Sequence, residues 1–396
     1  MNDREIFFRH LGLASFNPIG LEIVKAEGIY LTDRSGKRYL DLVSGISVSN
    51  IGHRHPKVME AIHKQSGNYL YLNVYGEFIQ SPQVQLAKRL AGLLGPSLDT
   101  VYFVNSGSEA IEGALKLAKR FTGRQEIISF RNAYHGSTHG ALSILGNEVL
   151  KNAFRPLLPD VRQLDFNHFE GLRNITNKTA CVVAETIQAE AGMVIPEKGF
   201  LQALRQRCTE TGSLLVIDDV QMGFGRTGKI FSHEHFQILP DILVLAKAMG
   251  AGLPLGAFIA SNAIMRTLAY EPELGHITTF GGHPLSCAAS LAGLEVLLAN
   301  DLLGSVEKKG LILEQTIESH PAIGKIRRVG LAIGVDLKEM EKRKVLSEAA
   351  IQEGIILDWY LFKPATFRIA PPLTITVAEI EEACHKLMKA LDQVSG

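Results

Sequence analysis

This sequence contains few cysteines and has no excess of positive or negative charge. Its 396 residues include four cysteines, and 41 Lys and Arg residues balance 41 Asp and Glu residues. The cysteines lie far apart and form no C-x-x-C pair, which argues against a disulfide framework and a zinc site. Because the charges balance and no basic tract occurs, the sequence gives no electrostatic support for binding nucleic acid or an anionic membrane.

Long apolar runs are missing as well. No stretch approaches the roughly 18 consecutive apolar residues of a transmembrane helix. The first residues, MNDREIFFRHLGLASF, contain no apolar run of signal-peptide length. With 46% hydrophobic and 21% charged residues, the composition is typical of a globular protein that buries large cores. We therefore expect a soluble, cytoplasmic protein.

Short apolar runs and helical patterns alternate through the middle of the chain. Residues 108–120 carry apolar residues at helical spacing, and residues 28–43 alternate around a turn as in a β-hairpin. Five apolar runs have the length of strands: 101–104, 181–184, 214–217, 242–245 and 255–259. This alternation predicts an α/β fold whose sheet is mostly parallel and covered on both faces.

The pattern changes near residue 300. Residues 284–299 have the Ala/Leu composition of a long helix, and the charge density rises beyond them. We expect a large cofactor-binding domain of residues 51–299. Residues 1–50 and residues 300–396 are expected to form the N-terminal and C-terminal parts of a smaller domain.

Two motifs suggest other kinds of site but lack the context that those sites need. The segment Gly223–Gly228 matches G-x-G-x-x-G, but Lys229–His233 after it shows no helical periodicity, which a dinucleotide site requires. The same segment nearly matches a P-loop, but Ile230 stands where a Ser or Thr would hold magnesium. The two histidines of residues 53–55 have no companion Cys or carboxylate, so we predict no metal.

Lys247 is a candidate for holding an aldehyde cofactor. It follows an apolar run, it is the only charged residue within 242–265, and Gly250 and Gly252 come shortly after it. A pocket amine can hold an aldehyde as a Schiff base, and the glycines would let the chain pass close to a flat ring. A strand-end lysine that points into solvent is the alternative.

A carboxylate is expected beneath such a ring. Asp218 and Asp219 follow the apolar run LLVI, and Asp218 is favoured because it comes directly after that run. A buried carboxylate stabilises a protonated pyridine nitrogen by charge pairing, and Gln221 could bind the ring hydroxyl. The alternative is a strand-end aspartate that caps a turn.

A phosphate site and a ring platform complete the pattern. Ser106, Gly107 and Ser108 lie between a strand and a helix, where free backbone N–H groups and the helix dipole bind anions. An ordinary helix N-cap is the alternative. Tyr134 could stack on one face of a flat ring, and Val220 could pack on the other. Together these parts predict a site for pyridoxal-5′-phosphate (PLP).

Arg368, in the segment FRIAPP, is a candidate for binding a substrate carboxylate. A guanidinium fork binds a carboxylate through two parallel hydrogen bonds. A surface arginine is the alternative. We expect small amino and keto acids as the partners of such a site.

The motifs, in their order along the chain, resemble the class III aminotransferases from about residue 18 to residue 390. The matching pieces are SGISVSNIGHRHP, NSGSEAIEGALKLAK, AYHGST, AETIQAEAG, IDDVQMGFGRTG, LAKAMGAGLPLGA, TTFGGHPLSCAA and RIAPPL. The resemblance implies the fold type I of PLP-dependent transferases and a ping-pong mechanism. It implies an ornithine-, acetylornithine- or 4-aminobutyrate-like donor of an ω-amino group, with 2-oxoglutarate or another keto acid as acceptor.

For the cofactor, the resemblance implies a role for each matching residue. Lys247 would be the Schiff-base lysine and proton shuttle, and Asp218 would pair with the ring nitrogen. Thr279 would reach the phosphate from the neighbouring subunit, which implies a homodimer with shared active sites. The remaining cofactor residues would be Val220, Gln221, Gly107 and Ser108.

For the substrate, the resemblance implies that Glu190 pairs with Arg368 and gates it, so that one pocket accepts both an ω-amino donor and an α-dicarboxylate. Many members have Arg where this chain has Ser137, and ornithine aminotransferases tend to have Tyr where it has Ile46. Ser137 argues against assigning ornithine, acetylornithine or 4-aminobutyrate as the donor by name, and Ile46 argues further against ornithine. The donor and the acceptor stay open. A different PLP reaction (mutase, decarboxylase or racemase) and a non-catalytic PLP-binding protein are alternatives.

Overall fold

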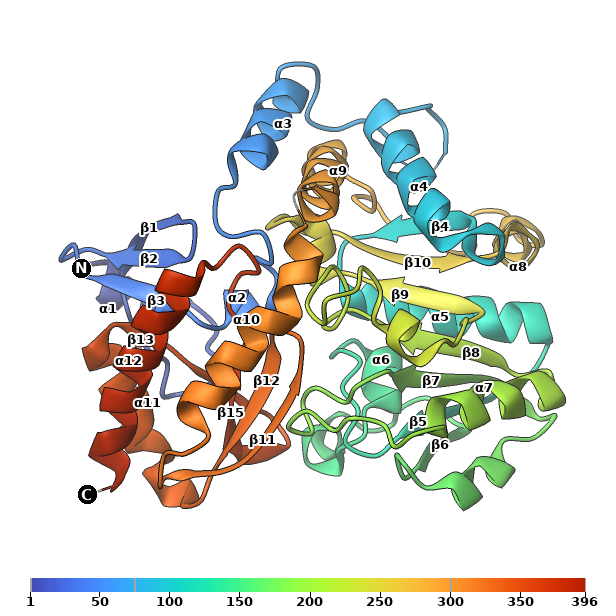
Figure 1. Ribbon diagram of the computed structural model, residues 1–396. Helices are drawn as coiled ribbons and strands as arrows, with labels where there is room; N and C mark the ends of the chain where they lie inside the picture. The colour runs from blue at the N-terminus through green and yellow to red at the C-terminus, as the bar shows by residue number, and fades with distance from the viewer. Residues whose placement is uncertain (1, 75, 300, 396) are drawn as a thin grey trace.

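A seven-stranded sheet is the largest sheet of the structure (Figure 1). The computed structural model describes residues 2–74, 76–299 and 301–395. Strand β10 runs antiparallel to both of its neighbours, and the other pairs are parallel. The predicted α/β fold with a mostly parallel sheet is therefore confirmed. The strand order is β4 (Thr100–Val104), β10 (Gly256–Ala260), β9 (Ile242–Leu245), β8 (Leu214–Asp218), β7 (Thr179–Glu185), β5 (Glu126–Phe130) and β6 (Val161–Leu164).

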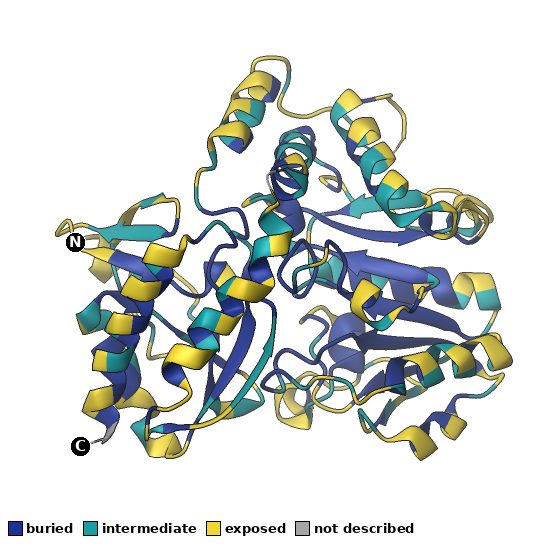
Figure 2. Cartoon of the chain, viewed as in Figure 1, coloured by how far each residue is buried: buried dark blue, intermediate teal, exposed yellow. Residues whose placement is uncertain are grey.

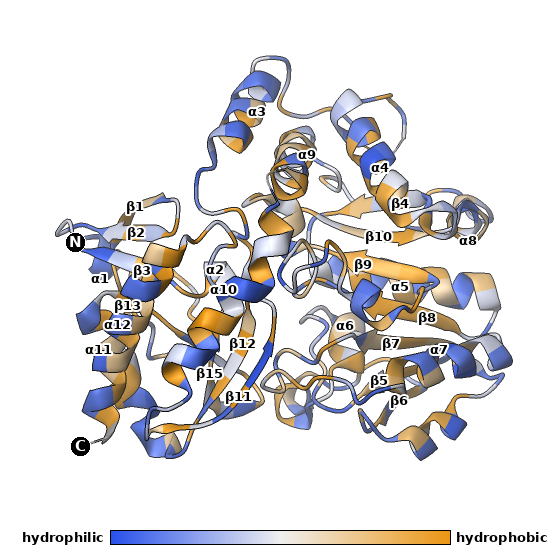
Figure 3. Ribbon diagram, viewed as in Figure 1, coloured by the Kyte–Doolittle hydropathy of each residue, from blue (hydrophilic) through white to orange (hydrophobic). Residues whose placement is uncertain are grey.

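Alternate residues of the central strands pack into two separate cores, as expected for a sheet covered on both faces. Cys181 and Val183 of β7 share a core with α5 (Gly107–Thr122). Their neighbours Val182 and Ala184 share the other core with α7 (Phe200–Thr211). Strands β7, β8 and β9 are buried throughout (Figure 2) and largely hydrophobic (Figure 3). Each fully buried Val, Leu or Ile side chain contributes about 1.5–3 kcal/mol, so the sheet is a rigid support for its ends.

Two four-stranded sheets lie beside the large one. One has the order β1 (Ile23–Glu27), β2 (Tyr30–Asp33), β3 (Arg38–Asp41) and β13 (Ile355–Ile356). The other has the order β11 (Ile323–Val329), β12 (Ala332–Leu337), β15 (Lys363–Ile369) and β14 (Asp358–Tyr360). Because β3 pairs in parallel with β13, the two ends of the chain share a sheet (Figure 1). This pairing supports the division at residues 50 and 299, which stays a prediction.

Helices cover the sheets and connect them. No single helix of the described residues is long and apolar enough to cross a membrane; α9 (Pro284–Leu298) and α10 (Leu302–Ile317) pass that test only together, across a bend of 71°. The other α-helices are α1 (Asp3–His10), α2 (Ser44–Ser47), α3 (Pro56–Ser66), α4 (Ser81–Leu94), α6 (His139–Ile144), α8 (Asn262–Met265), α11 (Arg343–Glu353) and α12 (Val377–Ser395).

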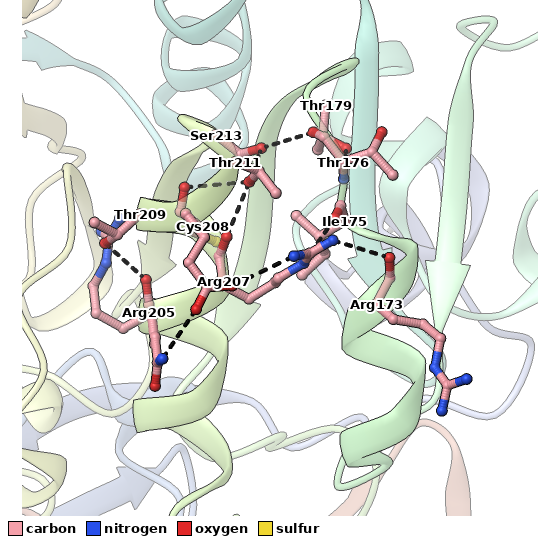
Figure 4. Close-up of polar contacts among 12 residues, drawn as sticks. Arg173, Ile175, Thr176, Thr179, Arg205, Arg207, Cys208, Thr209, Thr211 and Ser213 are labelled. Carbon is pink, nitrogen blue, oxygen red and sulfur yellow. Dashed lines mark hydrogen bonds and ion pairs between the residues drawn. The ribbon is translucent and has the colours of Figure 1, made fainter.

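The two ends of the parallel strands carry different chemistry. At the amino ends of β7 and β8, side chains bind main-chain carbonyl groups: Arg207 Nε donates to Ile175 O at 2.9 Å (Figure 4). The carboxyl ends of these strands carry the acids Glu185 and Asp218. Ligands of open α/β sheets bind outside the carboxyl ends of the strands, so the site is expected there.

Candidate active site

A cavity of about 390 Å³ lies at the carboxyl ends of β7, β8 and β9. Of the residues proposed from the sequence, it brings eight together, namely Ser106, Gly107, Ser108, Tyr134, Asp218, Val220, Gln221 and Lys247. Five others do not line it, namely Ile46, Ser137, Glu190, Thr279 and Arg368. The cavity is completed by residues that the sequence did not single out, among them Val48, His135, Glu185 and Leu253.

Lys247 lies two residues after β9, where the chain turns with a φ of 49°. Its Nζ donates a hydrogen bond to Gln221 Oε1 at 3.0 Å. Burial lowers the pKa of the amine to about 8; the Arg368 charge acts in the same direction, and the Glu190 and Asp218 carboxylates oppose it. The amine can therefore exchange a proton near neutral pH.

Asp218 is the last residue of β8, and two donors hold its carboxylate. Oδ1 accepts the Val220 N–H at 3.1 Å, and Oδ2 lies 2.7 Å from His135 Nδ1. His135 is buried, and the described residues offer its Nε2 no hydrogen-bond partner. The neighbouring Asp219 instead accepts the Ser232 N–H at 2.9 Å, and burial raises its pKa to about 7. Of the two acids, only Asp218 lines the cavity.

Glu185 is a cavity residue that sequence reasoning missed. It ends β7, and its carboxylate accepts the N–H groups of Tyr134 at 3.1 Å and Ala189 at 3.0 Å. Burial raises its pKa to about 7, although the nearby His135 lowers it. The signal that could have found it is its place at the end of an apolar run, which is the same signal that identified Asp218.

The start of α5 forms one corner of the cavity. The Ser106 hydroxyl caps the helix by accepting the Glu109 N–H at 3.2 Å. A side chain at Gly107 would place a Cβ 3.1 Å from Val220, so glycine keeps this corner open. Ser108 Oγ accepts the Ser137 N–H at 3.3 Å. The free N–H groups of a helix of this length favour a phosphate here.

Arg368 and Glu190 form a buried ion pair. Arg368 Nη2 donates to Glu190 Oε1 at 2.6 Å. Among the described residues, Nε and Nη1 of Arg368 have no hydrogen-bond partner, although Asp358 Oδ2 lies 3.4 Å from Nη1. Burial opposes the charge of Arg368, but the Glu190 carboxylate and the Tyr360 and Asp358 side chains raise its pKa above the ordinary range. Nε and Nη1 of Arg368 are thus buried without a hydrogen bond to any described residue, and Nη1 faces the Asp358 carboxylate.

The remaining residues proposed from the sequence lie outside the cavity. Ile46 is exposed in α2 with a φ of 62°, whereas Val48, two residues later, lines the cavity. Ser137 is exposed, and so is Thr279, whose carbonyl oxygen accepts the Tyr71 hydroxyl at 2.8 Å. Within one subunit, Thr279 therefore does not reach the cavity corner at the start of α5.

The histidines of residues 53–55 and the G-x-G-x-x-G segment make contacts within the fold. His53 Nε2 lies 2.8 Å from Asp41 Oδ2. Across the described ranges, no group of three or more His, Cys, Asp or Glu residues is arranged to hold a metal. In the G-x-G-x-x-G segment the chain turns back on itself, with Phe224 N–H donating to Ile230 O at 2.7 Å. A helix does not begin at these glycines.

The cavity fits PLP. It places an amine of lowered pKa (Lys247), a held carboxylate (Asp218), an aromatic ring (Tyr134) and the start of a long helix around one space. An aldehyde, a pyridine nitrogen, a flat ring and a phosphate need these four kinds of partner. The fit is supported by Gly107, because a larger residue there would reach the Val220 side chain.

The chain matches the family described as aminotransferase class-III over residues 14–391. It is 37% identical over 395 residues, 99% of each chain, to the acetylornithine aminotransferase of Methanopyrus kandleri. It is 36% identical over 384 residues, 94% of this chain and 95% of the relative, to a LysW-aminoadipate semialdehyde/glutamate semialdehyde transaminase of Sulfurisphaera tokodaii.

Solved structures agree with these relatives. The ornithine aminotransferase of Toxoplasma gondii superimposes with a TM-score of 0.92 at 27% identity, covering 100% of this chain and 96% of that one. An (S)-enantioselective omega-transaminase of Thermomicrobium roseum gives a TM-score of 0.90 at 30% identity, covering 99% and 98%. The chain therefore belongs to the class III aminotransferases and is a PLP-dependent transaminase.

Proposed function

We propose that this transaminase takes the ω-amino group of an ornithine-, acetylornithine- or 4-aminobutyrate-like donor and passes it to 2-oxoglutarate or another keto acid. The observation that carries the proposal is the buried pair of Arg368 and Glu190, 2.6 Å apart. While the pair holds, Glu190 neutralises the guanidinium, and an amino end without a carboxylate can enter. When Glu190 moves away, Arg368 offers its fork to the α-carboxylate of the acceptor.

Each proposed cofactor residue would hold one part of PLP. When bound, PLP supplies an aldehyde that takes up the amino group and a ring that draws electrons from the reacting carbon. Asp218 would pair with the ring nitrogen, while Tyr134 and Val220 would enclose the ring. The phosphate would bind the start of α5 at Ser106, Gly107 and Ser108.

Lys247 would move the proton. With a pKa lowered by burial to about 8, its Nζ can accept a proton from the substrate carbon and return one near neutral pH. Gln221 accepts a hydrogen bond from Nζ at 3.0 Å and keeps the amine in the cavity. His135 lies 2.7 Å from the Asp218 carboxylate and fixes its orientation.

Initial-rate kinetics test the proposed reaction. At several fixed donor concentrations, double-reciprocal plots against 2-oxoglutarate should give parallel lines, because the donor product leaves before the acceptor binds. Lines that intersect would contradict the proposal. Donor supplied alone should yield one keto or aldehyde product per active site and no carbon dioxide. Arg368→Met should raise the KM of the keto-acid acceptor far more than it changes the KM of a donor without an α-carboxylate.

We infer a homodimer in which Thr279 completes the phosphate site of the other subunit. Thr279 lies outside the cavity of its own subunit and beside exposed apolar residues. Tyr71 packs its ring against Phe280 at 5.1 Å, so the segments around residues 71 and 279 lie side by side. The exposed apolar side chains of these segments are Leu70, Leu72, Phe78, Ile79, Ile277 and Phe280. Such a patch on one face is typical of an interface.

A mixed-dimer experiment tests this shared site. Lys247→Ala and Thr279→Asp should each be inactive as homodimers. If Thr279 acts across the interface, co-expressed subunits should recover up to about half of the activity per mixed dimer, because one of the two symmetric sites then holds both native residues. No recovery in purified mixed dimers, or a monomer in light scattering, would contradict the proposal.

We also propose that the enzyme works in the cytoplasm, without a nucleic-acid or membrane partner. Its four cysteines are all buried and unpaired, as in a reducing compartment. Its formal net charge of zero supports no polyanion partner. Fractionation of the native cell, with activity recovered in the soluble fraction, checks this location.

A further inference from the structure

The glycine-rich segment of residues 223–230 forms a turn around a buried arginine. It is a tight turn in which Gly225 N–H donates to Lys229 O at 3.1 Å, and Gly225 and Gly228 have φ angles of +86° and +92°. A Cβ at Gly225 would lie 2.7 Å from Leu373, so the turn packs closely on the segment that follows β15. The turn carries Arg226 at its centre, and Arg226 is among the largest fully buried side chains of the described residues.

Arg226 binds three separate segments of the chain. Its Nη1 donates to Leu331 O at 3.0 Å and to Pro371 O at 2.6 Å, and its Nη2 donates to Asn50 Oδ1 at 2.6 Å. All three acceptors are neutral. Burial lowers the pKa of Arg226 to about 9, and the charge of Asp41 partly compensates. A buried cation whose hydrogen bonds go only to neutral oxygens costs stability. Such a cost suggests that Arg226 has a role in the function of the site.

The three acceptors surround the strand that carries Arg368. Pro371 lies three residues after Arg368, at the exit of β15. Leu331 directly precedes β12, the strand whose Gly334 pairs with Arg368. The segment of residues 42–50 binds the same exit, because Leu42 O accepts the Ala370 N–H at 2.7 Å.

The same segment of residues 42–50 also reaches the cavity. Asn50 Nδ2 donates to Phe224 O at 2.8 Å, and Asn50 O accepts the Leu373 N–H at 2.7 Å. Val48, two residues before Asn50, lines the cavity. The hydrogen bonds of the Arg226 guanidinium therefore connect three segments: the one that contributes Val48 to the cavity, the end of β15 and the start of β12.

We propose that Arg226 is a positioning residue that sets the place of the Arg368 guanidinium relative to the cavity around Lys247. It touches neither substrate nor cofactor and acts through the main chain on either side of Arg368. The inference rests on the proposed role of Arg368 in binding carboxylate, and it assigns to Arg226 a share of the preference for carboxylate-bearing ligands.

Two probes measure that preference without turnover. The aminooxy nitrogen of aminooxyacetate or of O-methylhydroxylamine forms an oxime with the carbonyl carbon of the bound cofactor and releases the Lys247 amine from it. Only aminooxyacetate carries a carboxylate. Spectral titration of the holoenzyme with each probe gives a ratio of apparent affinities that reports carboxylate recognition. We expect Arg226→Met to lower this ratio about tenfold or more, and Arg226→Lys, which keeps the charge but lacks the fork, to lower it less.

Arg124 offers a matched control at the amino ends of β7 and β8, away from the cavity. Its Nη1 donates to the carbonyl oxygens of Thr179, Thr211 and Gly212, each at 3.0 Å, next to the polar cluster of Figure 4. We expect Arg124→Met to lower the melting temperature and leave the ratio unchanged. An equal fall of the ratio in Arg124→Met, or an unchanged ratio in folded Arg226→Met, would overturn the inference.

Two further variants keep the test decisive. If Arg226→Met does not fold, Arg226→Lys answers the question, and an unchanged ratio in that variant overturns the inference. Arg368→Met tests the underlying role of Arg368, because it should abolish the preference. If Arg368→Met leaves the ratio intact, the proposed carboxylate site fails; if only the Arg226 variants leave it intact, the positioning role alone fails.

Discussion

Replacing Lys247 by Met should stabilise the enzyme from which the cofactor has been removed. A pKa of about 8 in place of the ordinary 10.5 makes the protonated amine about 3 kcal/mol less stable in the folded protein than in the unfolded chain, at about 1.4 kcal/mol per pKa unit. Lys247 is partly open to the cavity, and the variant loses the hydrogen bond to Gln221, so we expect a net gain of about 1–2 kcal/mol at pH 7.

The pH dependence gives the sign of the effect. Between pH 8 and 10.5 the unfolded chain binds more protons at Lys247 than the folded protein does, so the apoenzyme should become more stable as the pH rises through that window. Below pH 8 the full cost is present. Lys247→Met should lack this rise, whereas Lys344→Met, whose native side chain is 86% exposed, should retain it.

Urea unfolding of the apoenzymes at a fixed protein concentration measures both effects, since the apparent stability of an oligomer depends on concentration. The midpoint of Lys247→Met should exceed that of the wild type at pH 7, and the difference should shrink toward pH 10. A lower midpoint for Lys247→Met at pH 7, or the same pH slope in both proteins, would refute the reasoning that burial of the charge dominates at Lys247.

Three further substitutions test other parts of the site. Asp218→Asn removes the charge that we propose to pair with the ring nitrogen and should lower kcat about 100-fold or more, measured with saturating PLP. Gly136→Ala adds a Cβ against the Ser108 hydroxyl at a φ of +125° and should weaken cofactor binding about tenfold in equilibrium dialysis; unchanged binding would show that the turn can relax. Asp358→Asn removes a half-exposed carboxylate 3.4 Å from Arg368 and should lower the KM of the keto-acid acceptor about 2- to 5-fold; a higher KM would show that Asp358 orients Arg368 instead of competing for it.

The sequence predicts the strands well because a buried strand appears in it as a short run of apolar residues. Residues 214–217 and Ile242–Leu245 are runs of apolar residues whose short length and β-branched content favour buried strands. The same run does not show whether a strand lies parallel or antiparallel to its neighbours. Residues 256–260 resemble their neighbouring strands in composition, yet β10 is antiparallel, because direction is set by where the connecting segments run.

A site residue can be predicted where a charged side chain follows an apolar run of strand length, as Asp218 and Lys247 do. It is not predictable where two distant residues must meet. His135 and Asp218 are 83 positions apart, and a single histidine in a loop has no pattern that names its partner. The same holds for Arg226, whose acceptors are 105, 145 and 176 positions away. Such contacts depend on how the whole chain packs, and no local pattern in the sequence predicts them.

The short strand β13 has a consequence for how the protein is made. It closes the sheet that begins with β1, β2 and β3, and Leu40 N–H donates to Gly354 O at 2.9 Å. At synthesis rates of roughly 5–20 residues per second, β3 leaves the ribosome roughly 15–60 s before β13 follows. During that interval β3 has an open edge, which other strands can join. A nascent chain that stalls before residue 355 therefore keeps that edge open, and its N-terminal hairpin becomes a place for chaperones to bind or for aggregation to start.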